Sequence, residues 1–147
     1  MLEKIKFKYF PTVTLCYDYL INNTDISEND KNNAIEFVCN NASASELFHF
    51  LKNTDRLNLS ETDVSLLVEA IIKIGEIGYI VDVANLTTIR KDDRFLITNS
   101  VYLKTDINDI EYYVYKVKYL DNSDYSLLSE KIGKSKDPEK IYEFASN

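Results

Sequence analysis

Side chains that commonly carry catalysis or bind metal ions are few in this sequence and are not grouped. The chain of 147 residues has one histidine, His49, which lies between two phenylalanines. No nucleophilic serine or cysteine pattern and no second metal ligand at a suitable spacing accompanies it. We interpret His49 as a surface or partly buried residue and expect no catalytic, metal-binding or cofactor-binding residue. A small-molecule enzyme that works through carboxylates alone is the least favoured alternative.

Two pairs of aspartates are the remaining candidates for a divalent cation. Asp92 and Asp93 are adjacent, and Asp106 and Asp109 are three residues apart. Carboxylates are good ligands for such ions, but both pairs stand where the start of a helix favours acids in any case. With only three glycines, a glycine-rich loop that cradles phosphate is also missing. The sequence therefore predicts that the protein is not an enzyme.

The two cysteines and the hydropathy pattern bear on location. Cys16 and Cys39 have no ligand-like spacing, and no stretch resembles a signal peptide or an apolar span of about 18 residues. We expect two buried thiols in a reducing cytoplasm, either of a bacterium or of an infected host cell, and no contact with a membrane.

The helices that would position any site are predicted to begin at regularly spaced helix-capping positions. Four helix-start signals are each followed sixteen residues later by another, at Ser27/Ser43, Ser60/Glu76, Arg90/Asp106 and Asp121/Asp137. Serine and aspartate cap the free N–H groups of a first helical turn, whereas arginine does not, so Asp92 is expected to cap the helix after Arg90. The pattern predicts helices at 28–40, 44–54, 61–74, 77–86, 92–104, 107–120, 122–134 and 138–146.

These helices form a repeat. Nine residues recur at one fixed offset: Asp63, Ser65, Leu66, Leu67, Glu69, Ile71, Lys73, Ile80 and Ala84 reappear as Asp124, Ser126, Leu127, Leu128, Glu130, Ile132, Lys134, Ile141 and Ala145. The apolar positions of one hairpin line one face, which needs a neighbouring hairpin to cover it. We expect an all-α fold, a short right-handed α-solenoid of about four helical hairpins at 27–59, 60–89, 90–120 and 121–147, in a single domain over 1–147.

Residues 1–26 do not fit the repeat and are expected to form an N-terminal cap. From Lys4 to Tyr9 charged and apolar residues alternate, which is typical of an extended arm rather than a helix. After Pro11, apolar residues recur at helical spacing, namely Val13, Cys16, Tyr17, Leu20 and Ile21. This second stretch predicts a lone helix that covers the first hairpin.

The segments Glu69–Gly75 and Ser135–Ala145 resemble a degenerate helical repeat of low-GC bacteria and large viruses, which is similar to HEAT-type α-solenoids. The resemblance covers residues 27–147 at most and consists of apolar and capping positions. It implies an array that binds other macromolecules, and it implies no catalytic residue.

Acidic residues are concentrated in the first half. Residues 9–82 hold twelve acids against four bases, whereas residues 83–147 hold eleven acids and ten bases. Such a surface repels nucleic acid and attracts basic partners. We expect the partner-binding acids to include Glu28, Glu36, Glu46, Asp55, Glu69 and Asp82. The alternative is that these acids only cap helices and keep the protein soluble.

Tyrosines give a second candidate surface. In the helix expected at 107–120, Tyr113 and Val114 point inward, so Tyr112, Tyr115 and Tyr119 fall on the other side. Exposed tyrosines often anchor protein interfaces, although these rings could instead pack on the fourth hairpin. Lysines between them resemble a weak nucleic-acid platform, which the overall acidity argues against.

These features favour a non-enzymatic protein-binding module or inhibitor that acts through an acidic surface on a basic partner. A sharper hypothesis is a nucleic-acid mimic that occludes a nucleic-acid-binding site, such as a phage anti-defence protein of the anti-CRISPR type or a toxin-immunity protein. The alternative is a structural protein that self-associates, forming a homodimer through an apolar edge at Leu128, Ile132 and Phe144.

Overall fold

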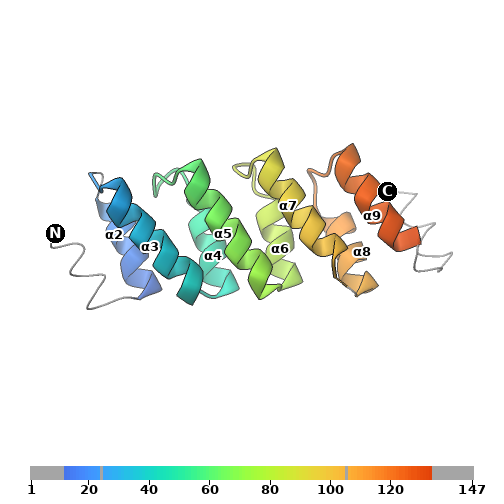
Figure 1. Cartoon of the computed structure of the whole chain (residues 1–147), viewed down its shortest axis with the longest axis horizontal. Coiled ribbons are helices and arrows are strands. Elements are labelled where there is room, and N and C mark those ends of the chain that lie inside the picture. Colours follow the sequence, from blue (N-terminus) through green and yellow to red (C-terminus); the bar gives the residue numbers. More distant parts are fainter. Residues whose placement is uncertain (1–11, 24, 105, 134–147) are drawn as a thin grey trace. The chain divides into compact units, whose positions relative to one another are not determined.

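The protein is helical throughout the part that the structure describes. The computed structural model describes residues 12–23, 25–104 and 106–133, and within them all regular structure is α-helix (Figure 1). Eight helices follow one another in these ranges: α2 (Val13–Asn22), α3 (Glu28–Asn41), α4 (Ala44–Lys52), α5 (Glu61–Ile74), α6 (Ile77–Ala84), α7 (Lys91–Tyr102), α8 (Ile107–Lys116) and α9 (Asn122–Gly133). The all-α prediction is confirmed. The right-handed solenoid of four hairpins stays a prediction, as does the single domain.

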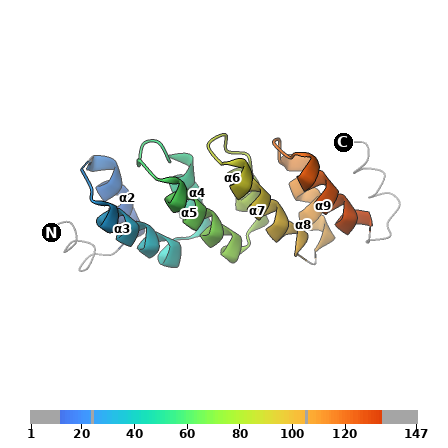
Figure 2. The same ribbon diagram turned by 45° about the horizontal axis from the view of Figure 1, so that its top comes forward.

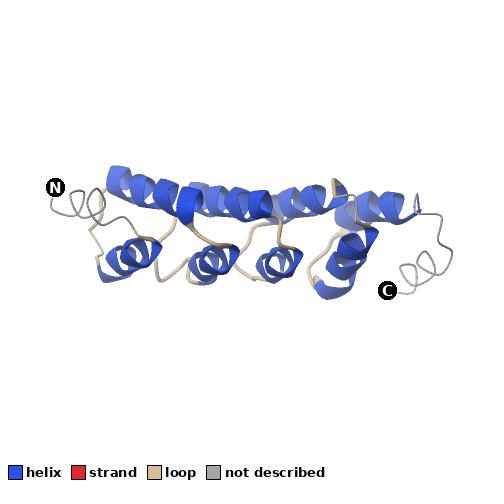
Figure 3. Ribbon diagram, turned by 90° about the horizontal axis from the view of Figure 1, so that it is seen from below, coloured by secondary structure: helices blue, strands red, loops and turns tan. Residues whose placement is uncertain are grey.

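The chain divides into two compact units, residues 1–79 and 80–147. In the first unit α2 packs on α3, and both α3 and α4 pack on α5. Helices α3 and α5 lie side by side in one layer, and α2 and α4 form a second layer behind them (Figures 1 and 3). In the second unit α7 and α8 pack on each other and on α9 (Figure 2). Each unit thus buries the apolar faces that its amphipathic helices present.

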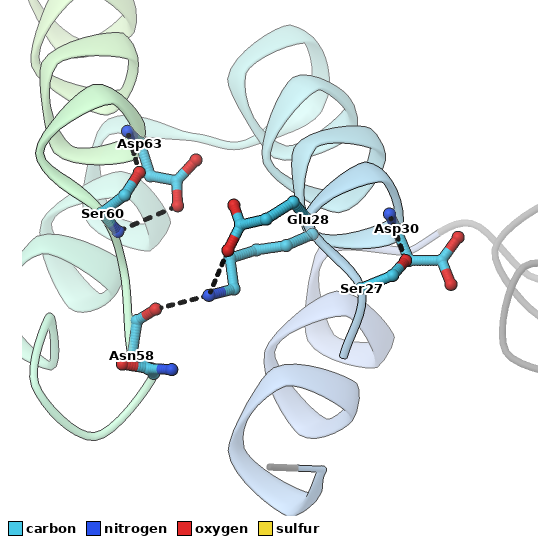
Figure 4. A network of polar contacts seen from close by, with 7 residues as sticks. Ser27, Glu28, Asp30, Asn58, Ser60 and Asp63 are labelled. Carbon is cyan, nitrogen blue, oxygen red and sulfur yellow. Dashed lines mark hydrogen bonds and ion pairs between the residues drawn. The ribbon is translucent and has the colours of Figure 1, made fainter. Parts of the chain in front are cut away.

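The predicted caps start most of these helices. Ser27, Ser43 and Ser60 each accept a hydrogen bond from the backbone N–H three residues on, at 3.1–3.2 Å, and Asp106 caps α8 by accepting from Asn108 N. Three starts are closed in both directions, because the acid at the third position accepts from the N–H of the cap residue. These reciprocal pairs are Ser43/Glu46, Ser60/Asp63 and Asp121/Asp124 (Figure 4 shows the second).

One predicted cap is wrong. Helix α7 begins at Lys91, so Arg90 holds the cap position, where its side chain makes no capping hydrogen bond. Asp92 was expected to cap this helix, but it lies inside the first turn, two residues past the cap position. Asp93 takes part instead, because its Oδ2 lies 3.4 Å from the Nε of Arg90. An ion pair therefore fixes this start in place of a cap.

Helix α8 ends four residues earlier than predicted, at Lys116. Asn85, in the loop after α6, binds the next stretch of backbone in extended form. Its Nδ2 donates to the carbonyl of Lys116 at 2.9 Å, and its Oδ1 accepts from the N–H of Lys118 at 2.7 Å. A side chain from another loop therefore replaces the helical hydrogen bonds that the sequence pattern predicted for 117–120.

Two cations at the same repeat position hold loops in place. Lys31 and Arg94 each come four residues after a cap position. The Nζ of Lys31, a buried residue, donates to the carbonyl of Asn58 at 2.8 Å (Figure 4). Asn58 is a loop residue with φ 53°. The guanidinium of Arg94 donates to three carbonyls at the end of α6 and in the loop after it, Ala84, Leu86 and Ile89, at 2.9–3.3 Å. Neither anchor was predicted.

Some of the expectations about the two ends of the chain concern residues that the structure describes. The helix expected after Pro11 is confirmed as α2, with Cys16 and Leu20 buried. Leu128 and Ile132 are also buried, so the expectation that they form an uncovered apolar edge is wrong. The extended arm at Lys4–Tyr9, the helix at 138–146 and Phe144 lie outside the described residues.

Candidate protein-binding surface

Carboxylates gather along the layer formed by α3 and α5. Glu36 on α3 and Glu69 on α5 occupy the same repeat position, nine residues after their caps, and both are exposed. Helices α3 and α5 pack directly against each other, so these two residues lie on neighbouring helices of one layer. We call Glu28, Glu36 and Glu69 the acidic face.

Two carboxylates of the acidic face, Glu36 and Glu69, raise the pKa of the same thiol, that of Cys39. Cys39 lies on α3 and is half-buried, and its pKa is raised to about 11, first by burial and then by the charges of Asp63, Glu69 and Glu36. Electrostatic influence of this kind falls off steeply with distance in a protein. Carboxylates from both helices therefore lie within electrostatic reach of the Cys39 thiol. An unreactive, protonated thiol is the consequence.

Within residues 12–79, exposed acids outnumber exposed bases. Residues 12–79 contain four bases, of which Lys31 is buried against Asn58, leaving Lys52, Arg56 and Lys73 exposed. Eight carboxylates in the same range are exposed: Asp18, Asp25, Glu28, Glu36, Asp55, Glu61, Glu69 and Glu76. The imbalance that the composition indicated is thus present at the surface.

The predicted acids differ in their exposure, their partners and their place in the fold. Glu46 is half-exposed and its Oε1 accepts from Ser43 N at 2.9 Å, so one of its oxygens is used in the start of α4. Glu28 is exposed but lies 3.9 Å from the Nζ of Lys31. Asp55 is exposed in the loop after α4, and Asp82 is exposed on α6 in the second unit. Of these predicted acids, only Glu28, Glu36 and Glu69 lie on α3 or α5.

The three predicted tyrosines are all partly exposed, in the second unit. Tyr112, Tyr115 and Tyr119 expose 43%, 40% and 45% of their surface, respectively. Tyr112 and Tyr115 lie on α8, but Tyr119 follows its end and is held by a cation, because the guanidinium carbon of Arg94 lies 5.2 Å from its ring centre. The single helical stripe expected from the sequence is therefore broken between Tyr115 and Tyr119.

Tyr113 points the other way and is buried, as predicted. Its hydroxyl lies 2.8 Å from the hydroxyl of Thr98 on α7. Burial raises the pKa of Tyr113 well above its ordinary value, against the lowering effect of that hydrogen bond. Burial likewise raises the pKa of Asp124, whose Oδ1 has no hydrogen-bond partner among the described residues. These buried polar groups belong to the core of the second unit.

The described residues contain no group of three or more histidine, cysteine, aspartate or glutamate side chains that could hold a metal ion. Asp92 is exposed, whereas Asp93 is buried beside Arg90, so this pair does not form a shared ligand set. Cys16 is fully buried, and burial raises its pKa to about 12. Within the described ranges, no helix has the length and apolar character needed to cross a membrane.

Comparison with protein-family models, with curated proteins and with solved structures found no match to this chain.

Sequence reasoning missed three residues whose side chains hold loops in place. Lys31, Asn85 and Arg94 each bind backbone carbonyls or N–H groups of a loop. Two of them could have been noticed, because a base four residues after a cap occurs at Lys31 and again at Arg94. Nothing local in the sequence marks Asn85, whose partners lie more than thirty residues away.

Proposed function

We propose that this protein is a non-enzymatic binding module that docks a basic protein partner through the acidic face of α3 and α5. The observation that carries the proposal is the pairing of Glu36 and Glu69 on adjacent helices, among described residues of 12–79 in which eight carboxylates and three bases are exposed. Neither glutamate lies in the first turn of its helix, so neither is explained by helix capping. These two side chains are available for a partner.

The proposed partner is a protein with a positively charged groove. A negative surface built on rigid helices speeds association with a positively charged groove and selects against other partners. Basic grooves of that kind hold nucleic acid in nucleases and other nucleic-acid-handling proteins. The protein would then occlude such a groove in the cytoplasm, as a phage anti-defence or toxin-immunity protein would. The exposed Tyr112, Tyr115 and Tyr119 supply a second contact area of the type that anchors interfaces.

Affinity capture with the full chain tests this function. The bait is compared at about 0.05 M and about 0.5 M salt, because the Debye length shortens from more than about 10 Å to a few Å over that range. We expect capture of a basic, nucleic-acid-handling protein at low salt and its loss at high salt. Recovery of only neutral or acidic partners, bound equally at both salt concentrations, would overturn the proposal.

A charge-matched pair of variants separates the acidic face from the overall charge. Glu36→Lys with Glu69→Lys reverses two charges on the face. Asp25→Lys with Asp55→Lys makes the same change in net charge at two exposed loop residues of the same unit. Capture should be lost with the first pair and retained with the second. Equal loss in both would show that net charge alone attracts the partner.

A further inference from the structure

A groove lies between α2 and α4, in the layer of the first unit that does not carry the acidic face. Its volume is about 340 Å³, and its lining includes Thr14 and Tyr17 from α2 and Ser45, Glu46, His49 and Phe50 from α4. All of these residues belong to one compact unit.

Aromatic rings form the wall of the groove. The rings of Tyr17 and His49 lie 4.7 Å apart between centroids, with 32° between their planes. Phe50, which is almost fully buried, meets Tyr17 edge-on, at 5.4 Å and 86°. This edge-to-face contact fixes the Tyr17 ring, while His49 is exposed. The tyrosine ring carries the negative π-surface to which cations bind, and Tyr17 brings such a ring to the lining of the groove.

Among the described residues that line the groove, a single carboxylate accompanies these rings and there is no lysine or arginine. Glu46 is held by the capping box of α4, where its Oε1 accepts from Ser43 N at 2.9 Å. Its second oxygen, Oε2, makes no hydrogen bond within the described residues. The negative charge of Glu46 is therefore fixed in position, and its Oε2 can still accept a hydrogen bond. The hydroxyls of Thr14 and Ser45 are neutral and add no opposing charge.

We propose that this groove binds the guanidinium group of an arginine side chain presented by a protein partner. A planar guanidinium can stack on the Tyr17 ring, next to His49, while its N–H groups donate to Glu46, a combination that favours arginine over the compact ammonium of lysine. The site stands on α2 and α4, whereas the proposed function stands on α3 and α5. Failure of either one therefore leaves the other intact.

The test uses NMR of the full-length protein, because His49 is the only histidine and its imidazole signals need no assignment. A blocked Gly-Arg-Gly peptide is titrated, with the matching citrulline peptide as a neutral analogue of the same shape and a lysine peptide as the second cation. We expect saturable shifts of the His49 signals with the arginine peptide, weaker binding of the lysine peptide and no saturation with citrulline. Equal responses to arginine and citrulline would overturn the proposal.

Two variants assign the binding to the groove. Glu46→Gln removes the charge but keeps a capping side chain at this position, and we expect it to weaken arginine binding about tenfold. Glu76→Gln removes one exposed charge outside the groove lining instead and should leave binding within about twofold, as expected for a screened surface charge. Equal affinities in the two variants would refute a role for Glu46. Far-UV circular dichroism and thermal midpoints confirm that both variants are folded.

A third variant tests the chain's own lysines as the occupant, because Lys4, Lys6 and Lys8 precede α2 in the sequence. Replacing all three by glutamine should leave the arginine affinity unchanged. A clear rise in affinity would show that these lysines compete for the groove, and would overturn the assignment to a partner's arginine.

Discussion

Arg94 offers the sharpest test of how the second unit is held together. Its guanidinium donates three hydrogen bonds, through Nε to the carbonyl of Ala84 and through Nη2 to the carbonyls of Leu86 and Ile89. Substitution by methionine keeps the apolar stem of the side chain and removes every donor. The three carbonyls would then lose a partner in a half-buried loop.

The size of the effect follows from these contacts. A hydrogen bond contributes about 1 kcal/mol net, so removing three should lower the free energy of unfolding by about 3 kcal/mol. For a chain of this size that corresponds to a thermal midpoint lower by roughly 6 to 12 °C. Arg94→Lys keeps the charge, but a single ammonium cannot span three carbonyls in a fixed fork, so about 2 kcal/mol should still be lost.

Urea denaturation followed by far-UV circular dichroism measures these differences. Arg56→Met is the matched control, because Arg56 is exposed in a loop and the same atoms are removed; its effect should stay within about 0.5 kcal/mol. A loss below about 0.5 kcal/mol in Arg94→Met would refute the role of Arg94 as a loop anchor. An Arg94→Lys variant as stable as the wild type would show that charge alone suffices.

Three further predictions concern buried groups and loops. In a double-mutant cycle, Tyr113→Phe and Thr98→Val should each cost about 1–2 kcal/mol but share a coupling of about 1 kcal/mol, because their hydroxyls bond each other; additive losses would contradict this. The pKa of the Cys16 thiol is raised from 9.0 to about 12 in the folded protein, so the unfolded chain ionises first and stability falls as pH rises above 9. Between pH 7 and about pH 10 this fall should be about 1.4 kcal/mol smaller in Cys16→Ala, measured by urea denaturation at each pH. Asn85→Ala should cost about 1 kcal/mol and speed hydrogen exchange at the N–H of Lys118; unchanged exchange would refute the contact.

The helices were predictable because their starts are chemical signals that act locally. Ser27, Ser43 and Ser60 cap the helices that the sequence assigned to them, and the acid at the third position closes two of these starts from the other side. Such a signal needs only the four residues that compose it. The inward direction of Tyr113 was predictable for a similar reason, since apolar spacing determines which side of a helix is covered.

The errors arose where a distant side chain competes with the local pattern. The sequence around 117–120 reads as helix, but Asn85 binds that backbone in an extended form. At α7 the sequence suggested that an acid must replace the missing cap, whereas Arg90 and Asp93 form an ion pair there. Both outcomes depend on contacts that become visible only when the chain is folded.

The acidic character of the candidate site was predictable from the sequence, but which residues lie on neighbouring helices was only partly predictable. An excess of acid in the first half follows from composition alone. The structure adds that Lys31 is withdrawn from the surface, and that Glu36 and Glu69 act on the same thiol, Cys39. It also shows that Glu46 serves the start of α4, a role that the capping pattern at Ser43 had already indicated.

The most direct test of the acidic face is the dissociation constant of the captured partner, measured by calorimetry with the two charge-matched variant pairs. We expect Glu36→Lys with Glu69→Lys to raise it at least about tenfold, which is about 1.4 kcal/mol, and Asp25→Lys with Asp55→Lys to change it less than about threefold. Equal dissociation constants for the two pairs would contradict the central claim that the α3/α5 surface binds the partner.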